Sequence, residues 1–198
     1  MKKQPELTAQ TKENLTEAFW QIYCSKRIEK ITVKEITARA GYNRSTFYEY
    51  FTDVYDILEQ IENSLLPSQE DLPPLSLINI PITSLPIDMF IKMYEKNRKY
   101  YIVLLGDNGD SSFQSKIKRS VKEMLNKMLL AQGIVDNYEL DFTLEFILSA
   151  MIGVLSYWFK LDTIPPKDKL IKLMYELMDN GVIHKLIAEG SSDHIAHG

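Results

Sequence analysis

The stretch from Thr32 to Phe51, TVKEITARAGYNRSTFYEYF, carries start and stop signals for two short helices within a few residues of each other. Thr32 followed by Glu35 is the pattern of a capping box, in which the hydroxyl and the carboxylate each accept a backbone N–H at a helix start. Gly41 stands where a helix end favours a residue that enters the left-handed region without strain. Asn43 can then cap a second helix. The pattern predicts two short helices joined by a tight turn.

Counting the apolar positions shows which side chains of this stretch remain outside the core. Val33, Ile36 and Ala40 share one face of the first helix, and Phe47 and Phe51 lie four residues apart near the second. The polar side chains left over suit contacts with phosphates and base edges in a DNA major groove. We therefore predict a DNA-contacting set of Thr32, Lys34, Tyr42, Asn43, Arg44, Ser45, Thr46, Tyr48 and Tyr50. At this point an ordinary helical hairpin with a solvated polar face remains open.

The same stretch resembles the N-terminal domain of the TetR/AcrR family of bacterial transcriptional regulators, whose pattern is roughly T-x-x-x-I-A-x-x-A-G-x-S-x-G-T-x-Y-x-H-F-x-x-K. The matching positions hold Thr32, Ile36, Ala40, Gly41, Thr46, Tyr48 and Phe51. The resemblance is strong over residues 8–60. It implies an all-α chain, with an N-terminal three-helix helix-turn-helix DNA-binding domain and a C-terminal helical regulatory and dimerisation domain.

Five positions depart from the family pattern. Thr37, Asn43, Ser45 and Tyr50 replace the usual Ala, Ser, Gly and His, and all four residue types are compatible with capping, packing or phosphate contact. Val54 replaces a Lys that in the family commonly touches a phosphate. The resemblance therefore leaves one backbone contact in doubt.

Charge is distributed unevenly along the chain. A basic cluster precedes and overlaps the motif, and it could supply salt-dependent DNA affinity: Lys26, Arg27, Lys30, Lys34, Arg39 and Arg44. No Lys or Arg follows until Lys92, whereas acidic residues recur in that interval, and the formal net charge is −4. The alternative for each basic residue is a solvated surface charge. Any DNA footprint must be local, which favours a site-specific regulator over a packaging protein.

Helical periodicity and proline positions divide the 198 residues into segments. We predict a helix-turn-helix domain over 1–52, with an amphipathic helix over 8–25, and a connecting helix over 53–66. A Pro-rich connection over 67–85 then leads to a helical ligand-binding and dimerisation domain over 86–189, with helices over 87–105, 112–132, 141–160 and 167–186. Residues 190–198 form a tail. No strand alternation is found.

Several classes of protein find little support in the sequence. There is no phosphate-binding Gly loop and no Cys pair, and two of the three His residues, His194 and His197, stand in the tail, so we predict no enzyme activity, no cofactor and no metal. The apolar run from Phe146 to Phe159 is too short to cross a bilayer of about 30 Å, which argues against a membrane protein. The N-terminus lacks a secretory signal, which predicts a cytoplasmic location. Lone Cys24 is expected to be a buried residue.

The C-terminal domain offers two candidate surfaces. Met and aromatic residues could line an apolar effector pocket, although residues with this spacing more often form an ordinary core: Phe90, Met93, Tyr94, Tyr101, Met124, Met128, Phe146, Tyr157 and Trp158. Small residues at helical spacing allow close helix approach, within one subunit or between two. The family resemblance implies a homodimer through a four-helix bundle of the last two long helices, with an expected interface of Ser149, Ile152, Gly153, Ser156, Leu173 and Leu177.

These observations lead to one main hypothesis and one alternative. The main hypothesis is a dimeric, ligand-responsive regulator whose expected role is repression rather than activation. It binds a palindromic double-stranded DNA operator and leaves the operator when a small-molecule effector binds. The alternative is a protein-binding adaptor or co-activator that keeps the fold with weak or no operator binding. Val54 and the acidic run after Arg44 keep the alternative open.

Overall fold

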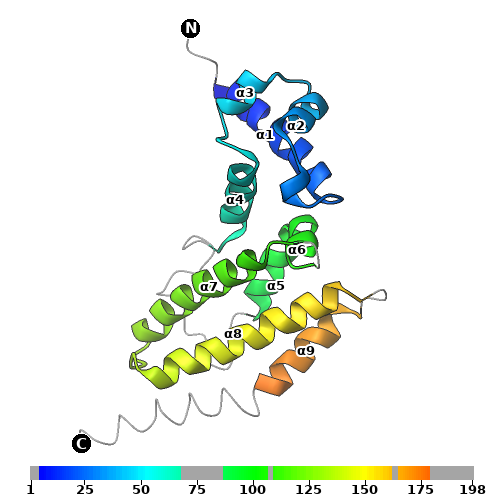
Figure 1. The fold of residues 1–198 in the computed structure, drawn as a ribbon. Helices are drawn as coiled ribbons and strands as arrows, with labels where there is room; N and C mark the ends of the chain where they lie inside the picture. The colour runs from blue at the N-terminus through cyan, green and yellow to red at the C-terminus, as the bar shows by residue number, and fades with distance from the viewer. Residues whose placement is uncertain (1–4, 68–86, 107–108, 162–164, 179–198) are drawn as a thin grey trace, which may run out of the picture. The chain divides into compact units, whose positions relative to one another are not determined.

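The computed structural model describes residues 5–67, 87–106, 109–161 and 165–178, and every regular element in these ranges is helical (Figure 1). This confirms the all-α prediction. The chain divides into two compact units, Met1–Leu65 and Leu66–Gly198. The predicted connection over 67–85 (apart from Pro67), the end of the last predicted helix with His184, and the tail lie outside the described residues. The predicted domain boundaries stay predictions.

Four α-helices form the first unit: α1 (Pro5–Tyr23), α2 (Val33–Ala40), α3 (Arg44–Tyr48) and α4 (Val54–Leu65), with a short 3-10 helix, η1 (Ile28–Lys30), between α1 and α2. Contacts join α1 to α2 and α4, and α2 to α3. The side chains at the centre are fully buried, and each helix contributes to them: Leu15, Phe19, Ile36, Phe47 and Ile57. Burying five large apolar side chains at about 1.5–3 kcal/mol each gives this small unit a core of its own.

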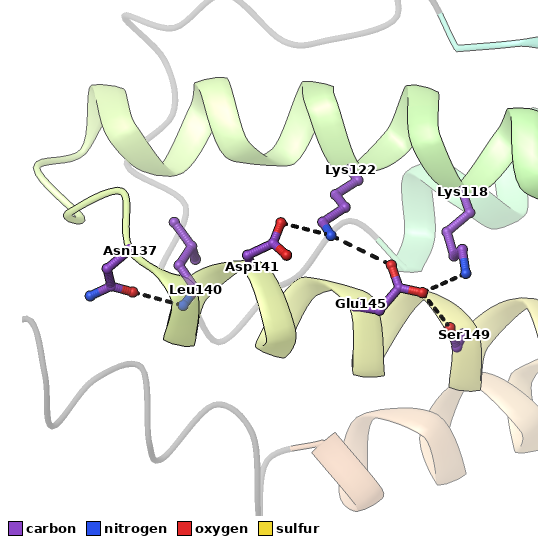
Figure 2. A network of polar contacts seen from close by, with 7 residues as sticks. All are labelled: Lys118, Lys122, Asn137, Leu140, Asp141, Glu145 and Ser149. Carbon is purple, nitrogen blue, oxygen red and sulfur yellow. Dashed lines mark hydrogen bonds and ion pairs between the residues drawn. The ribbon is translucent and has the colours of Figure 1, made fainter.

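The second unit contains α5 (Ile87–Lys96), α6 (Arg98–Leu104), α7 (Ser111–Ala131), α8 (Tyr138–Phe159) and α9 (Lys167–Met178). Helices α7 and α8 pack against each other, and α9 lies beside α8 (Figures 1 and 2). The turn between α7 and α8 contains Gly133 at φ 86°, a left-handed conformation that glycine adopts without strain. Asn137 then accepts the backbone N–H of Leu140, so α8 begins earlier than the predicted Asp141.

The predicted single helix over 87–105 is wrong, because the helix is interrupted at Asn97. This residue has φ −117° and ψ 23°, and α6 starts immediately after it. Its side-chain Nδ2 donates to the carbonyl of Met93 at 3.4 Å, and its backbone N–H donates to Tyr94. Asn side chains that bond to nearby backbone compete with the helical pattern, which explains a break that apolar periodicity did not reveal.

An ion-pair network joins α7 to α8 (Figure 2). Glu145 accepts from Lys118 at 2.5 Å, and Lys122 pairs with Asp141 at 2.8 Å and with Glu145 at 3.5 Å. The bond from Lys118 lowers the pKa of Glu145, and the bond to Asp141 raises the pKa of Lys122. These pairs fix the register of two long helices at a partly exposed edge.

Helix α8 is the one described helix that is long and apolar enough to cross a membrane by length and composition. Its Leu144, Leu148 and Leu155 are buried within the unit, and its Asp141 and Glu145 bind lysines of α7. A helix that packs one side into a core and bonds another side to a neighbouring helix has the features of a core helix. This supports the earlier argument from the short charge-free run.

The prediction that Cys24 is buried is wrong. The side chain is exposed, because Tyr23 is the last residue of α1 and the chain turns outward at Cys24. Its backbone N–H still donates to the carbonyl of Trp20 at 3.0 Å. Helical spacing alone placed Cys24 in the apolar stripe, but the stripe ends one residue earlier.

Candidate nucleic-acid interface

The start of α2 is held by the predicted capping box. Thr32 Oγ1 accepts the N–H of Glu35 at 3.3 Å, and Glu35 Oε2 accepts the N–H of Thr32 at 2.9 Å. Lys26 Nζ lies 2.6 Å from Glu35 Oε1. The bond from Lys26, followed by the bonds from Thr32, lowers the pKa of Glu35 from 4.5 to about 2. The box fixes α2 and also pairs Lys26 within the protein.

Asn43 caps α3 with one oxygen that accepts three hydrogen bonds. Its Oδ1 lies 2.8 Å from Thr46 N, 2.9 Å from Thr46 Oγ1 and 2.6 Å from Ser45 Oγ. Asn is therefore a working replacement for the usual Ser at this position. The hydroxyl hydrogens of Ser45 and Thr46 point to the cap. In this conformation the two side chains can accept a hydrogen bond from a base edge, but they have no hydrogen to donate to a phosphate.

The exposed face of α3 is small and well defined. The helix has five residues, of which Phe47 is fully buried and packs its ring edge-on against Tyr48. Tyr48 is 59% exposed, and Arg44 is exposed one turn before it. Tyr50, just beyond the helix, is half-buried beside the ring of Phe51. Arg44 and Tyr48 are thus the side chains of α3 best placed to reach a partner.

The predicted basic cluster divides into paired and exposed members. Lys26 binds Glu35, and Arg39 Nη1 donates to Gln21 Oε1 at 3.0 Å. Four members are exposed, and their side chains have no hydrogen bond or ion pair to the part of the chain that the structure describes: Arg27, Lys30, Lys34 and Arg44. These four cations keep their full charge available to an anionic partner.

Sequence reasoning missed Lys12. Its Nζ lies 5.8 Å from the centre of the Phe51 ring, and its charge acts on Asp56 in the first turn of α4. It therefore puts a cation next to the helix start where Val54, which is half-buried, carries none. The two positions are far apart in the chain, so no local spacing could have indicated this proximity.

The residues predicted to bind an effector fall into two groups. Tyr94, Tyr101, Met124 and Met128 are buried, and Tyr94 packs against Tyr101 and Trp158 with ring centres 5.6 Å and 6.2 Å away. Burial raises the pKa of Tyr94 to about 12, against the opposing effect of Arg98. Met93 is half-buried, and the side chain of Phe90 lies outside the described residues.

Phe146 and Tyr157 do not join this buried group. They are 65% and 67% exposed, and helical spacing puts them on the outer face of α8. Tyr138 and Phe142 lie on the same face at 72% and 70% exposure. Four large aromatic side chains on one outer strip are unusual for a solvated surface.

The same strip contains part of the predicted dimer interface. Ser149 and Gly153 are exposed between Phe146 and Tyr157, and on α9 both Leu173 and Leu177 are exposed, at 50% and 66%. Ile152 is only 7% exposed and faces the core of its own unit, and Ser156 is half-buried. Ile152 therefore offers little surface to a partner, whereas Tyr138 and Phe142, which the sequence did not single out for this interface, are exposed on this strip. The dimer interface stays a prediction.

Comparison with known proteins gives a family-model match and structural neighbours. A TetR-type family model, described as a transcriptional regulator C-terminal region, matches residues 87–180. A TetR transcriptional regulator from Streptococcus agalactiae 2603V shares 20% identity over 87% of this chain and 95% of its own, with a TM-score of 0.63. The fatty acid degradation regulator FadR from Bacillus halodurans shares 18% identity over 91% and 98%, with a TM-score of 0.64. No curated protein matches.

A further neighbour is the dihydroxyacetone kinase operon activator DhaS, with 17% identity over 90% of this chain and 97% of that one and a TM-score of 0.56. The shared fold and the C-terminal match define the class: an all-α transcriptional regulator with a helix-turn-helix unit and a second helical unit. Residues 87–180 are thus similar to the C-terminal region of TetR-type regulators, and the chain shares its fold with solved TetR-family regulators.

Proposed function

We propose that the protein is a homodimeric, effector-responsive DNA-binding repressor of a nearby operon in the cytoplasm. The proposal depends mainly on the arrangement of α3. Phe47 anchors this helix in the core and Asn43 caps its start. Arg44 and Tyr48 remain exposed. A short helix with a fixed start and two projecting side chains suits insertion into a major groove. Arg can bind a guanine edge or a phosphate with two parallel bonds.

The dimer places two such helices on one operator. In a two-fold symmetric dimer the same strip of each subunit contacts its copy. On α8 this strip would place aromatic rings against the partner, with one small residue between them: Tyr138, Phe142, Phe146, Gly153 and Tyr157. Leu173 and Leu177 of α9 extend this apolar surface. Recognition helices roughly 34 Å apart would then read half-sites one helical turn apart.

The effector enters the proposal through the second unit. Tyr94, Tyr101 and Trp158 form an aromatic group that joins α5, α6 and α8, and a flat apolar molecule could pack among such rings. Pro67, two residues after the end of α4, accepts a hydrogen bond from Ser120 of α7 at 3.3 Å. An effector that moves α7 would act through this bond on the chain segment that follows α4, and so on the DNA-binding unit. A coupling of about 1–3 kcal/mol is enough for regulation.

Footprinting on the protein's own upstream DNA tests the proposal. We expect a protected site with two symmetric halves at moderate salt. Arg44→Ala and Tyr48→Ala should weaken binding by about 1–3 kcal/mol each if they contact base edges. Arg119→Ala is the matched control, because Arg119 is an exposed arginine of α7. A folded, dimeric wild-type protein that protects no site would contradict the proposal.

Gly153→Glu tests the dimer separately. A Cβ added at Gly153 meets no heavy atom within 4 Å among the described residues, and the position is exposed, so the subunit itself should fold normally. We expect monomers in sedimentation and loss of binding to the full palindrome. Ala131→Glu, which adds the same charge at an exposed position of α7, should remain dimeric. A Gly153→Glu protein that stays dimeric would move the interface elsewhere.

A second candidate function is a protein-binding adaptor or activator. Two observations favour it: the hydroxyl hydrogens of Ser45 and Thr46 are directed to Asn43, and α4 lacks a basic residue in its first turn. One structural neighbour is an operon activator, so the fold itself accommodates activation. Absence of a footprint, together with a stable dimer, would favour this candidate.

A further inference from the structure

The hydroxyl of Tyr42 is held in place by two amide side chains of α1. Asn14 Nδ2 donates to the Tyr42 hydroxyl oxygen at 3.0 Å, and Gln10 Nε2 donates to Asn14 Oδ1 at 3.0 Å. Gln10 and Asn14 are one helical turn apart and so share a face of α1. The bond from Gln10 occupies the Asn14 oxygen, which turns the amide so that it presents an N–H to Tyr42.

The Tyr42 hydroxyl keeps one hydrogen-bonding capacity that the described residues do not use. A tyrosine hydroxyl has one hydrogen, and Asn14 uses only its oxygen. The hydrogen has no acceptor in the described part of the chain, and Tyr42 is half-buried rather than enclosed. The Tyr42 hydroxyl can therefore donate a hydrogen bond to an acceptor from outside the protein.

The location of Tyr42 indicates which acceptor. Tyr42 directly precedes Asn43, the cap of α3, and its own backbone N–H donates to the carbonyl of Thr37 at 2.9 Å. Both the backbone and the ring tip are thus fixed at the start of the recognition helix. Phosphate oxygens line the groove into which that helix would insert, and tyrosine hydroxyls are common donors to them.

We infer that Gln10 and Asn14 form a positioning pair that orients the Tyr42 hydroxyl as a donor to a DNA phosphate. This rests on the proposed DNA binding. Asn14 is a positioning residue, because it acts through Tyr42 and does not itself touch DNA. Holding the donor in its bound orientation removes the cost of ordering that side chain on binding.

A double-mutant cycle on DNA affinity tests the inference, with a duplex of the protein's upstream region as the probe. We expect Tyr42→Phe to weaken binding about tenfold, the lower range for a hydrogen bond to a charged group. Asn14→Ala should weaken binding less, and the double variant should bind as Tyr42→Phe does, because Asn14 has no effect without the hydroxyl. Multiplying losses in the double variant would overturn the inference.

Two further measurements distinguish positioning from a merely structural tie. Asn14→Asp replaces a donor by an acceptor, so the Tyr42 hydroxyl should donate its hydrogen to the new carboxylate and DNA binding should weaken. In the Tyr42→Phe background the same change should cost less, because only the repulsion between this carboxylate and the DNA phosphates remains. Melting followed by Trp20 fluorescence reports stability. Lower melting temperature with unchanged affinity in Asn14→Ala would overturn the inference. Wild-type protein that binds no DNA would contradict the proposed function as well, whereas binding unaffected by Tyr42→Phe would contradict this inference alone.

Discussion

The two units obtain their helices by different physical means. In the first unit, α3 has five residues and one buried side chain, and it depends on the Asn43 cap and the Thr32–Glu35 box beside it. In the second unit, α8 has 22 residues and is held by a long buried stripe. Short helices are marginal without caps or packing, whereas long amphipathic helices form when their apolar face is covered. This difference explains why a motif can be recognised in the sequence of the first unit and not in that of the second.

The polar contacts that cap α2 and α3 are local, although Asn14 also reaches Tyr42, 28 residues away in the same unit. The capping contacts of the first unit join residues two to four apart in the chain, as in Thr46 to Asn43 and Thr52 to Asp56. The main ion pair of the second unit joins Lys118 to Glu145, which are 27 residues apart. Local contacts leave a fixed spacing in the sequence, and contacts between distant residues leave none.

Matched core truncations should have the largest effect on the stability of the two units. Phe47 and Phe113 are both fully buried, in different units, so Phe47→Ala and Phe113→Ala should each cost about 3–5 kcal/mol. Each loss should appear in its own unit. Trp20 reports the first unit and Trp158 the second, so unfolding is followed in single-tryptophan variants that keep one or the other.

The separation of the two signals is the informative result. We expect Phe47→Ala to shift the Trp20 transition more than the Trp158 transition, and Phe113→Ala to do the reverse. Ala131→Glu, at an exposed position, is the control and should shift neither. Equal shifts of both signals in both variants would show that the two units unfold as one cooperative unit and differ only in local structure.

An intermediate effect is expected from matched cap removals. Asn43→Ala and Asn137→Ala each remove the oxygen that accepts an N–H at a helix start, a loss of typically about 1 kcal/mol. In α8 this should fray one turn and leave the rest of the helix formed. In α3 it should expose the amides of the whole helix, because only Phe47 anchors it. Hydrogen exchange at the two helices measures the difference, and equal protection losses would contradict it.

How much could be predicted from the sequence follows from the same division. The capping box, the left-handed Gly41 at φ 76° and the Asn43 cap were all predicted correctly, since each depends on residues a few positions apart. The regulatory unit was predicted as helical, but the break at Asn97 was missed. Periodicity records apolar positions and does not record a side chain that bonds to its own backbone.

The candidate sites show where sequence reasoning ends. Phe146 and Tyr157 were grouped with buried aromatics, yet they lie outside, because α8 is apolar on nearly all sides and its pattern does not say which side is covered. The approach of Lys12 to Phe51 and of Asn14 to Tyr42 depends on how α1 packs. The two approaches become visible only when the helices are placed in three dimensions.

Acid stability should change least, and the change should be confined to the first unit, where Glu35 caps a helix and also pairs with Lys26. The pKa of Glu35 falls from 4.5 to about 2 in the folded protein, through Lys26 first and Thr32 next. A carboxyl with a lowered folded pKa stabilises the protein above its unfolded pKa, and that stabilisation is lost as the pH falls from about 4.5 towards 2.

Glu35→Gln removes the titrating group, so the melting temperature reported by Trp20 should fall less steeply over this range than in the wild type. The Trp158 signal should keep its wild-type slope, because Glu145 and its bond from Lys118 are unchanged. Glu59→Gln, an exposed acid of α4, is the control for removing one carboxyl from the same unit. An unchanged Trp20 slope in Glu35→Gln would mean that the box holds α2 through its geometry alone and that the ion pair with Lys26 adds no stability.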